Sequence, residues 1–138
     1  MGVKTYRGSC HCGAVRFEAG MDLSEGTNRC NCSICSKARA WFALVPPDRF
    51  RLIAGEAAQT EYQWNAGHPP NLHYRFCRTC GIRTPGYGEH GPSGGPFYFV
   101  PIASLDDVDP DELAAAPLRY VDGRHDRYDR APEDTRLM

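Results

Sequence analysis

The sequence predicts a mainly β fold of antiparallel sheets stapled by metal, with one or two short helices. Apolar and polar residues alternate in several short segments, as they do in half-buried strands. Segments with a helical period are scarce. Seven cysteines fall into three short clusters, a grouping typical of domains that bind structural or catalytic metal.

The predicted strands are segments in which every second residue is apolar. In the first of them Val15, Phe17 and Ala19 alternate with two charged residues. We expect the strands to pair in antiparallel sheets, and the most aromatic of them ends at Val100. The predicted strands span residues 15–19, 43–45, 50–53, 60–64, 72–76 and 97–100.

Two short segments are expected to be helical. Asp109 can cap a helix, because Pro110 suits the first helical position and Glu112 lies three residues after the cap; this helix ends before Pro117. A second short helix or turn is expected over residues 33–40, directly after a cysteine cluster. The Gly- and Pro-rich residues 86–96 are expected to form a loop.

Chain length and net charge limit the classes of protein to which this sequence can belong. A chain of 138 residues predicts a single domain over residues 1–138. The 16 basic and 17 acidic residues nearly cancel, so we expect no nucleic-acid or anionic-membrane partner. No apolar stretch approaches the roughly 20 residues of a membrane helix, and the N-terminus does not resemble a secretion signal. These features predict a soluble, cytoplasmic protein.

The cysteine clusters partition into two metal sites. Each of the two pairs is two ligands short of a tetrahedral zinc site, so the pairs are expected to share one structural ion. The three remaining cysteines, called the trio below, lie within six residues and can converge on a second ion whose last position stays open. The pairs are Cys10 with Cys12 and Cys77 with Cys80, and the trio is Cys30, Cys32 and Cys35.

The residues beside the pairs support this division. Neighbouring sulfurs of a tetrahedral zinc site lie about 3.8 Å apart, which requires tight turns. Gly13 follows Cys12 and Gly81 follows Cys80, and each supplies the permissive backbone of such a turn. A structural zinc contributes roughly 10–16 kcal/mol, comparable with the stability of a whole domain, so its loss is expected to unfold the protein.

Disulfides and redox switching are the alternative uses of these cysteines. Seven is an odd number, and a reducing cytoplasm fits the absence of a secretion signal better than disulfides do. A redox switch would make the trio a reactive thiol with a resolving partner, marked by reversible metal release under mild oxidant. Metal binding is the interpretation we favour.

The order of the clusters resembles a known family. Cys10-His-Cys12-Gly, then Cys30-x-Cys32-x-x-Cys35, then Phe-Cys77-x-x-Cys80-Gly, is similar to the signature of the glutathione-dependent formaldehyde-activating enzyme family, also called the centromere protein V/Gfa family. The resemblance covers most of the chain. Further similar positions are residues 13–17, Phe50, Gly55, Tyr62, residues 102–105 and residues 122–123.

The resemblance implies a fold, cofactors and an activity. The fold is layered antiparallel sheets, described as β-tent or Mss4-like, with two zinc ions per chain. The two pairs would hold the structural zinc and the trio (Cys30, Cys32, Cys35) the catalytic one. The activity is that of a carbon–sulfur lyase acting on an adduct of glutathione and formaldehyde, with a small thiol and a small aldehyde as partners. The alternative is a non-catalytic zinc-binding scaffold in which both zincs are structural.

An open site with three thiolates suits thiol chemistry better than hydrolysis. Three thiolates leave zinc with a formal charge of about −1, which weakens it as a Lewis acid relative to a three-histidine site. A substrate thiol is a suitable fourth ligand, and its coordination would add further negative charge. Local cations should therefore matter. Lys37 and Arg39 follow the trio and could hold substrate carboxylates, although an exposed basic turn is the interpretation we favour.

Several other residues have two interpretations. His73 and Arg75 alternate with apolar residues on the strand that ends at Cys77, so His73 could face the metals as a general acid or fourth ligand, or face water. Trp41 and Phe42 could wall a substrate pocket, although core packing is the commoner use. His11 is expected to shape a turn, and the sign-alternating residues 119–130 to form a solvated surface. No partner is evident for His68, His90 and His125.

Overall fold

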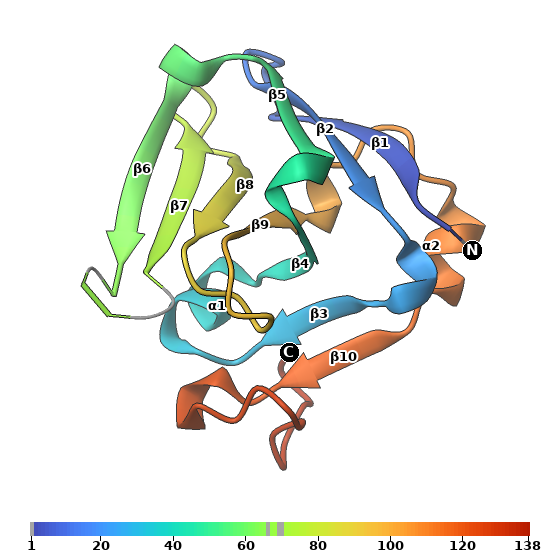
Figure 1. The fold of residues 1–138 in the computed structure, drawn as a ribbon, viewed down its shortest axis with the longest axis vertical. Coiled ribbons are helices and arrows are strands. Elements are labelled where there is room, and N and C mark those ends of the chain that lie inside the picture. Colours follow the sequence, from blue (N-terminus) through green and yellow to red (C-terminus); the bar gives the residue numbers. More distant parts are fainter. Residues whose placement is uncertain (1, 66, 69–70) are drawn as a thin grey trace.

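The computed structural model describes residues 2–65, 67–68 and 71–138, and these form a mainly β structure with two short α-helices (Figure 1). The fold class predicted from the sequence is therefore confirmed. The helices are α1 (Ser33–Ala38) and α2 (Pro110–Ala115). The strands are β1 (Lys4–Ser9), β2 (Arg16–Met21), β3 (Thr27–Cys30), β4 (Trp41–Val45), β5 (Phe50–Ala54), β6 (Gln59–Trp64), β7 (Leu72–Cys77), β8 (Arg83–Gly88), β9 (Phe97–Pro101) and β10 (Leu118–Val121).

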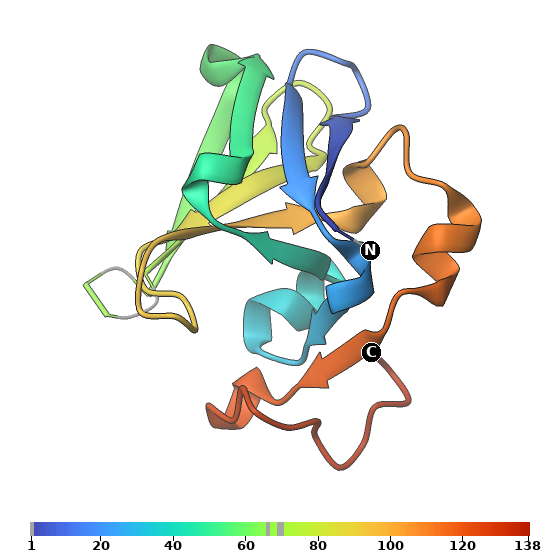
Figure 2. The same cartoon turned by 45° about the vertical axis from the view of Figure 1, so that its right-hand side comes forward.

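The strands form two sheets that converge at one end of the molecule. The small sheet has the order β1-β2-β5, and the large sheet has the order β10-β3-β4-β9-β8-β7-β6. In Figures 1 and 2 the small sheet and the β6–β8 end of the large sheet approach each other at the top, like two sides of a tent. This convergence brings the β1–β2 turn close to the β7–β8 turn, and both turns carry cysteines.

One strand pair departs from the expected antiparallel arrangement. β10 pairs with β3 in parallel, with Leu118 opposite Thr27 and Val121 opposite Cys30. The other pairs within the two sheets are antiparallel. Parallel strands need a long connection rather than a hairpin. Here that connection contains six strands, so no local sequence pattern predicts that β10 pairs with β3.

The main core lies between the small sheet and the middle of the large sheet. The predicted alternation of residues 15–19 is confirmed, because Phe17 and Ala19 are buried in this core while Val15 is buried beside Cys10 and Cys77. Packing of the two sheets therefore fixes the frame on which the cysteine turns sit. The buried cluster comprises Tyr6, Phe17, Ala19, Met21, Leu23, Ala43, Val45, Val100 and Ile102.

β8 corrects the prediction of a loop over residues 86–96. Residues 86–88 continue a strand, and only the rest of that segment is irregular. A Cβ added to Gly86 would lie 2.1 Å from the Phe99 ring, and one added to Gly88 would lie 2.3 Å from the Phe97 ring. Glycine is thus required in this strand by close packing against β9, and its frequency does not signal a turn here.

Both expected helices are present. The Asp109 carboxylate accepts a hydrogen bond from the backbone N–H of Asp111 at 2.9 Å, so α2 begins with the predicted cap. α1 begins directly after Cys32 and ends at Arg39, whose φ of 54° is left-handed. Within the described parts of the chain, no helix has the length and apolar character needed to cross a bilayer.

Candidate metal centre

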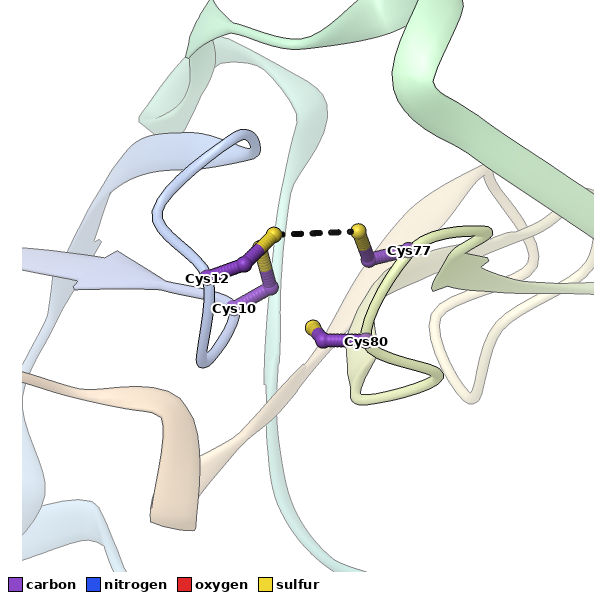
Figure 3. A group of neighbouring side chains, drawn as sticks. All are labelled: Cys10, Cys12, Cys77 and Cys80. Carbon is purple, nitrogen blue, oxygen red and sulfur yellow. Dashed lines mark hydrogen bonds between the residues drawn. The ribbon is translucent and has the colours of Figure 1, made fainter.

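Four cysteines from two turns converge where the sheets meet. Cys10 and Cys12 come from the β1–β2 turn, and Cys77 and Cys80 come from the β7–β8 turn. Figure 3 shows their sulfurs pointing toward a common centre. The four Sγ atoms lie within 4.8 Å of one another, and the Cys12 Sγ is 3.6 Å from both Cys10 Sγ and Cys77 Sγ. The structure therefore brings the two predicted pairs together.

This four-cysteine site fits a tetrahedral zinc. Sulfur separations of 3.6 Å are close to the roughly 3.8 Å expected between thiolates on one zinc. Gly13 and Gly81 have φ values of 81° and 73°, so both glycines make the left-handed turns that the sequence predicted. Backbone N–H groups of Cys12 and Ile82 lower the pKa of Cys80 to about 6, which favours the thiolate that a metal needs.

The trio converges from β3 and α1. Cys30 ends β3, Cys32 is the N-cap of α1, and Cys35 lies one helical turn later on the same face. All three are buried, and their Sγ atoms lie within 4.8 Å of one another. Among the described residues, no histidine, aspartate, glutamate or further cysteine joins this group. The described residues thus offer three ligand atoms to a metal ion at this position.

Electrostatics explains why the trio suits a cation. Hydrogen bonds from Cys30 and Cys35, with help from backbone N–H groups of α1, lower the pKa of Cys32 to about 3. The same shared hydrogens raise the pKa of Cys30 and of Cys35. Three thiolates at this distance repel one another, so only one ionises readily without a counter-charge. A divalent cation would remove that conflict, and zinc is the usual partner of such thiolates.

The trio borders a cavity of about 1010 Å³. Trp41 lines this cavity, donates its indole N–H to Thr27 Oγ1 at 2.8 Å and also packs against the main core. Phe42 packs against the trio itself. Both uses considered for these residues are therefore present. Trp41 and Phe42 line the cavity, Trp41 also packs in the main core, and Phe42 is the one of the two that contacts the cysteines.

Tyr74, and not His73, faces the trio from β7. The Tyr74 hydroxyl lies 3.6 Å from Cys35 Sγ. His73 Nδ1 lies 2.9 Å from a carboxylate oxygen of Glu61, and Arg75 donates to the same carboxylate at 3.2 Å on the other face of the strand. Of the two interpretations of His73, the one that turns it toward the metals is excluded, because the apolar face of β7 is the one that faces the trio.

The basic residues directly after the trio are placed differently from each other. Lys37 is exposed and is not among the residues that line the cavity. Arg39 lines the cavity, and its guanidinium donates to the backbone oxygen of Leu137 at 3.0 Å. Other arginines from distant parts of the chain also reach the cavity, which residue spacing could not indicate. They are Arg29, Arg49, Arg83 and Arg119.

The segment after β10 also corrects the sequence analysis, because it packs over the trio instead of forming only a solvated surface. Asp122 is 3% exposed and accepts hydrogen bonds from Asn31 Nδ2 at 2.8 Å and from the His125 ring, a partner that the sequence did not reveal. The Asn31 hydrogen bond, with His125, holds the pKa of Asp122 below its usual value. Gly123 lies directly against Cys30. Only the resemblance at residues 122–123 hinted at this role.

Comparison with known proteins decides the family. The model of the glutathione-dependent formaldehyde-activating enzyme family matches residues 5–122, which include all seven cysteines. The chain belongs to this family. A crystal structure of a Rhodobacter sphaeroides protein, a Northeast Structural Genomics target, is also similar, with a TM-score of 0.64 and 32% sequence identity. The match covers 81% of this chain and 98% of that one.

Membership of the glutathione-dependent formaldehyde-activating family agrees with the state of the cysteines. All seven are free thiols in the structure, gathered in two groups that can hold metal ions and are consistent with zinc. The family gives the chain, at family level, a function of the glutathione-dependent formaldehyde-activating type. Within this family function, the trio and its cavity are the candidate site at which this chain would act.

Proposed function

We propose that this chain is a zinc-dependent carbon–sulfur lyase that acts on an adduct of glutathione, or a similar small thiol, with a small aldehyde such as formaldehyde. The observation that carries the proposal is the trio: three buried sulfurs, without a fourth metal-ligating side chain among the described residues, beside a large cavity. Cys30, Cys32 and Cys35 would hold the catalytic zinc. The structural zinc would be held by Cys10, Cys12, Cys77 and Cys80.

The residues around the trio suit a thiol substrate. When bound there, zinc would favour a soft fourth ligand and keep a substrate thiol deprotonated at neutral pH. Phe42 and Phe99 line the cavity with apolar surface. In the synthetic direction the substrate sulfur forms a bond to the aldehyde carbon, and the proton lost by the thiol ends on the new hydroxyl oxygen. The lyase direction reverses these changes.

The charge of the cavity supports glutathione as the thiol. Among the described residues that line it, five are arginines and only Asp22 and Glu25 are acidic. Glutathione carries two carboxylates and one ammonium group, so a cavity with excess positive charge complements it. The Arg29 guanidinium lies 5.2 Å from the centre of the Trp41 ring, which fixes one of these charges at the cavity wall.

The chemistry of the cysteines also supports a cellular location. Seven free thiols that would serve as metal ligands suit a reducing compartment, so the cytoplasm is the location we propose. The nearly balanced formal charge of the chain supports small molecules, and not nucleic acid, as partners.

The test is exchange of formaldehyde between free glutathione and its adduct, followed by NMR. We expect the zinc-loaded protein to accelerate exchange over buffer, and the Cys32→Ser variant to lose the acceleration while it keeps the fold and one zinc per chain. A rate equal to that of buffer, with two zincs bound, would instead support the non-catalytic scaffold. Ser33→Ala is a control, because this exposed residue of α1 is not a metal ligand.

A further inference from the structure

Tyr74 is a buried residue that lies beside the trio. Its side chain is 5% exposed, it lines the same cavity, and its hydroxyl is 3.6 Å from Cys35 Sγ. A metal-bound cysteine carries no hydrogen and can only accept. The single hydroxyl hydrogen of Tyr74 is therefore directed to the metal side of the cavity, and it turns from Cys35 Sγ when it donates to a substrate oxygen.

A β-bulge in β8 lies opposite Tyr74. His73 pairs with Tyr87 and Arg75 pairs with Thr84, so two residues of β8, Pro85 and Gly86, stand opposite Tyr74 alone. Proline lacks the N–H that a regular ladder would need. Bulges of this kind redirect a side chain and are frequent beside active sites.

Glycine is required on the bulged side. A Cβ added to Gly86 would lie 2.7 Å from the backbone oxygen of His73 and 2.1 Å from the Phe99 ring. Phe99 in turn packs on Tyr74, with ring centres 4.8 Å apart. The bulge and the aromatic contact together hold the Tyr74 ring against rotation.

Arg83 lies on the same ring. Its guanidinium carbon is 4.6 Å from the centre of the Tyr74 ring, and its Nη1 atom is buried without a hydrogen-bond partner. A buried guanidinium nitrogen without a partner is rare. Such a position is explained if the positive charge of Arg83 balances the negative charge of the trio. The three thiolates concentrate that negative charge one tyrosine side chain away.

We propose that Tyr74 is a catalytic residue whose hydroxyl donates a hydrogen bond to the aldehyde-derived oxygen of an adduct held by its sulfur at the trio, and that Arg83 positions this hydroxyl. The proposal rests on the proposed function. As the substrate sulfur bonds to the carbonyl carbon, the C=O π electrons move to oxygen. Tyr74 stabilises that developing negative charge until the oxygen takes up the proton that the thiol released.

The kinetic experiment compares Tyr74→Phe with the wild type in the NMR exchange assay. Removal of one donor to a developing oxyanion costs about 10²–10³ in rate, so we expect a loss of this size in kcat with zinc content unchanged. Tyr98→Phe is the matched control, because Tyr98 stacks on Phe50 and is not among the residues that line the cavity. A Tyr74→Phe rate equal to that of Tyr98→Phe would overturn the proposal.

A binding experiment separates this proposal from the proposed function. With Co²⁺ in place of zinc, the sulfur-to-metal absorption reports binding of 2-mercaptoethanol, which has a hydroxyl, or of ethanethiol, which has none. A single hydrogen bond predicts that wild type prefers 2-mercaptoethanol by about fivefold and that Tyr74→Phe shows no preference. An equal preference in both proteins would refute the role of Tyr74. A preference lost in the variant, without catalysis by the wild type, would keep the donor and reject only the lyase.

Arg83 is tested by its dependence on charge. If it positions the Tyr74 hydroxyl, Arg83→Gln should lower kcat about tenfold with little change in KM and should reduce the preference for 2-mercaptoethanol. Arg83→Lys, which keeps the charge, should restore part of both effects. Equal loss in the two variants, or a change in KM alone, would contradict a positioning role.

Discussion

At the scale of single residues, Gly123 controls how closely the C-terminal segment approaches the trio. A Cβ at this position would lie 2.5 Å from Cys30 Sγ and 3.3 Å from Cys32 Cβ, closer than packing allows. We expect Gly123→Ala to displace Cys30 and lower the zinc content from two ions per chain to one. Elemental analysis measures the zinc, and circular dichroism checks that the fold remains.

The control for this substitution is Gly95→Ala. An added Cβ at Gly95 would meet no atom within 4 Å, and its backbone is not left-handed. We expect two zinc ions per chain and unchanged exchange activity in this variant. Two ions in Gly123→Ala as well would show that the segment yields to the added methyl group and does not fix Cys30.

Residue spacing predicted the grouping of the cysteines but not their surroundings. Cysteines close in sequence, such as the trio, stand out because their separations match what a metal site needs. Tyr74, Arg83 and Asp122 are ordinary residues by type, and tertiary structure alone brings them to the trio. His73 was considered because histidine often acts in catalysis. The orientation of β7 instead turns its neighbour Tyr74 toward the trio.

At the scale of elements, α2 is tied to β1 through one carboxylate. Glu112 accepts hydrogen bonds from the Tyr6 hydroxyl and from Lys4 Nζ, and these contacts hold its pKa below the usual value. A lowered pKa means that the stabilisation is present above the unfolded pKa of about 4.3 and is lost as pH falls through the folded value.

We therefore expect Glu112→Gln to lower the urea midpoint at pH 7 and to make little difference once the pH is well below 4. The measurement is the difference between wild type and variant as a function of pH. Glu133→Gln is the control, because Glu133 is exposed and far from this contact in sequence. A difference that stayed constant with pH would mean that packing, and not the charge, carries the effect.

The predictability of each strand followed from its environment. β2, β6 and β7 were recognised because polar residues alternate with apolar or aromatic ones along their sequences. β8 lies between β7 and β9, and its residues 84–86 are buried together, so its pattern carries no period of two. Its glycines suggest a loop in the sequence, whereas in the structure Gly86 forms the bulge opposite Tyr74 with Pro85, and Gly88 pairs regularly with its neighbours.

At the scale of the whole molecule, the two candidate metal sites differ in what they join. The four-cysteine site links the β1–β2 turn of the small sheet to the β7–β8 turn of the large sheet, so its loss separates the two sheets where they converge. The trio comes from β3 and α1, which are neighbours along the chain. Closing a long loop through a metal removes more chain entropy than closing a short one.

This difference predicts opposite outcomes for two chemically identical substitutions. Cys77→Ser should abolish cooperative thermal unfolding, because a structural zinc contributes roughly 10–16 kcal/mol against a total stability of about 5–15 kcal/mol. Cys32→Ser should retain a cooperative transition and one zinc per chain. Calorimetry with elemental analysis measures both quantities. If Cys77→Ser melted like wild type, the core between the sheets would suffice for folding without the metal, and the trio could be the site on which stability depends.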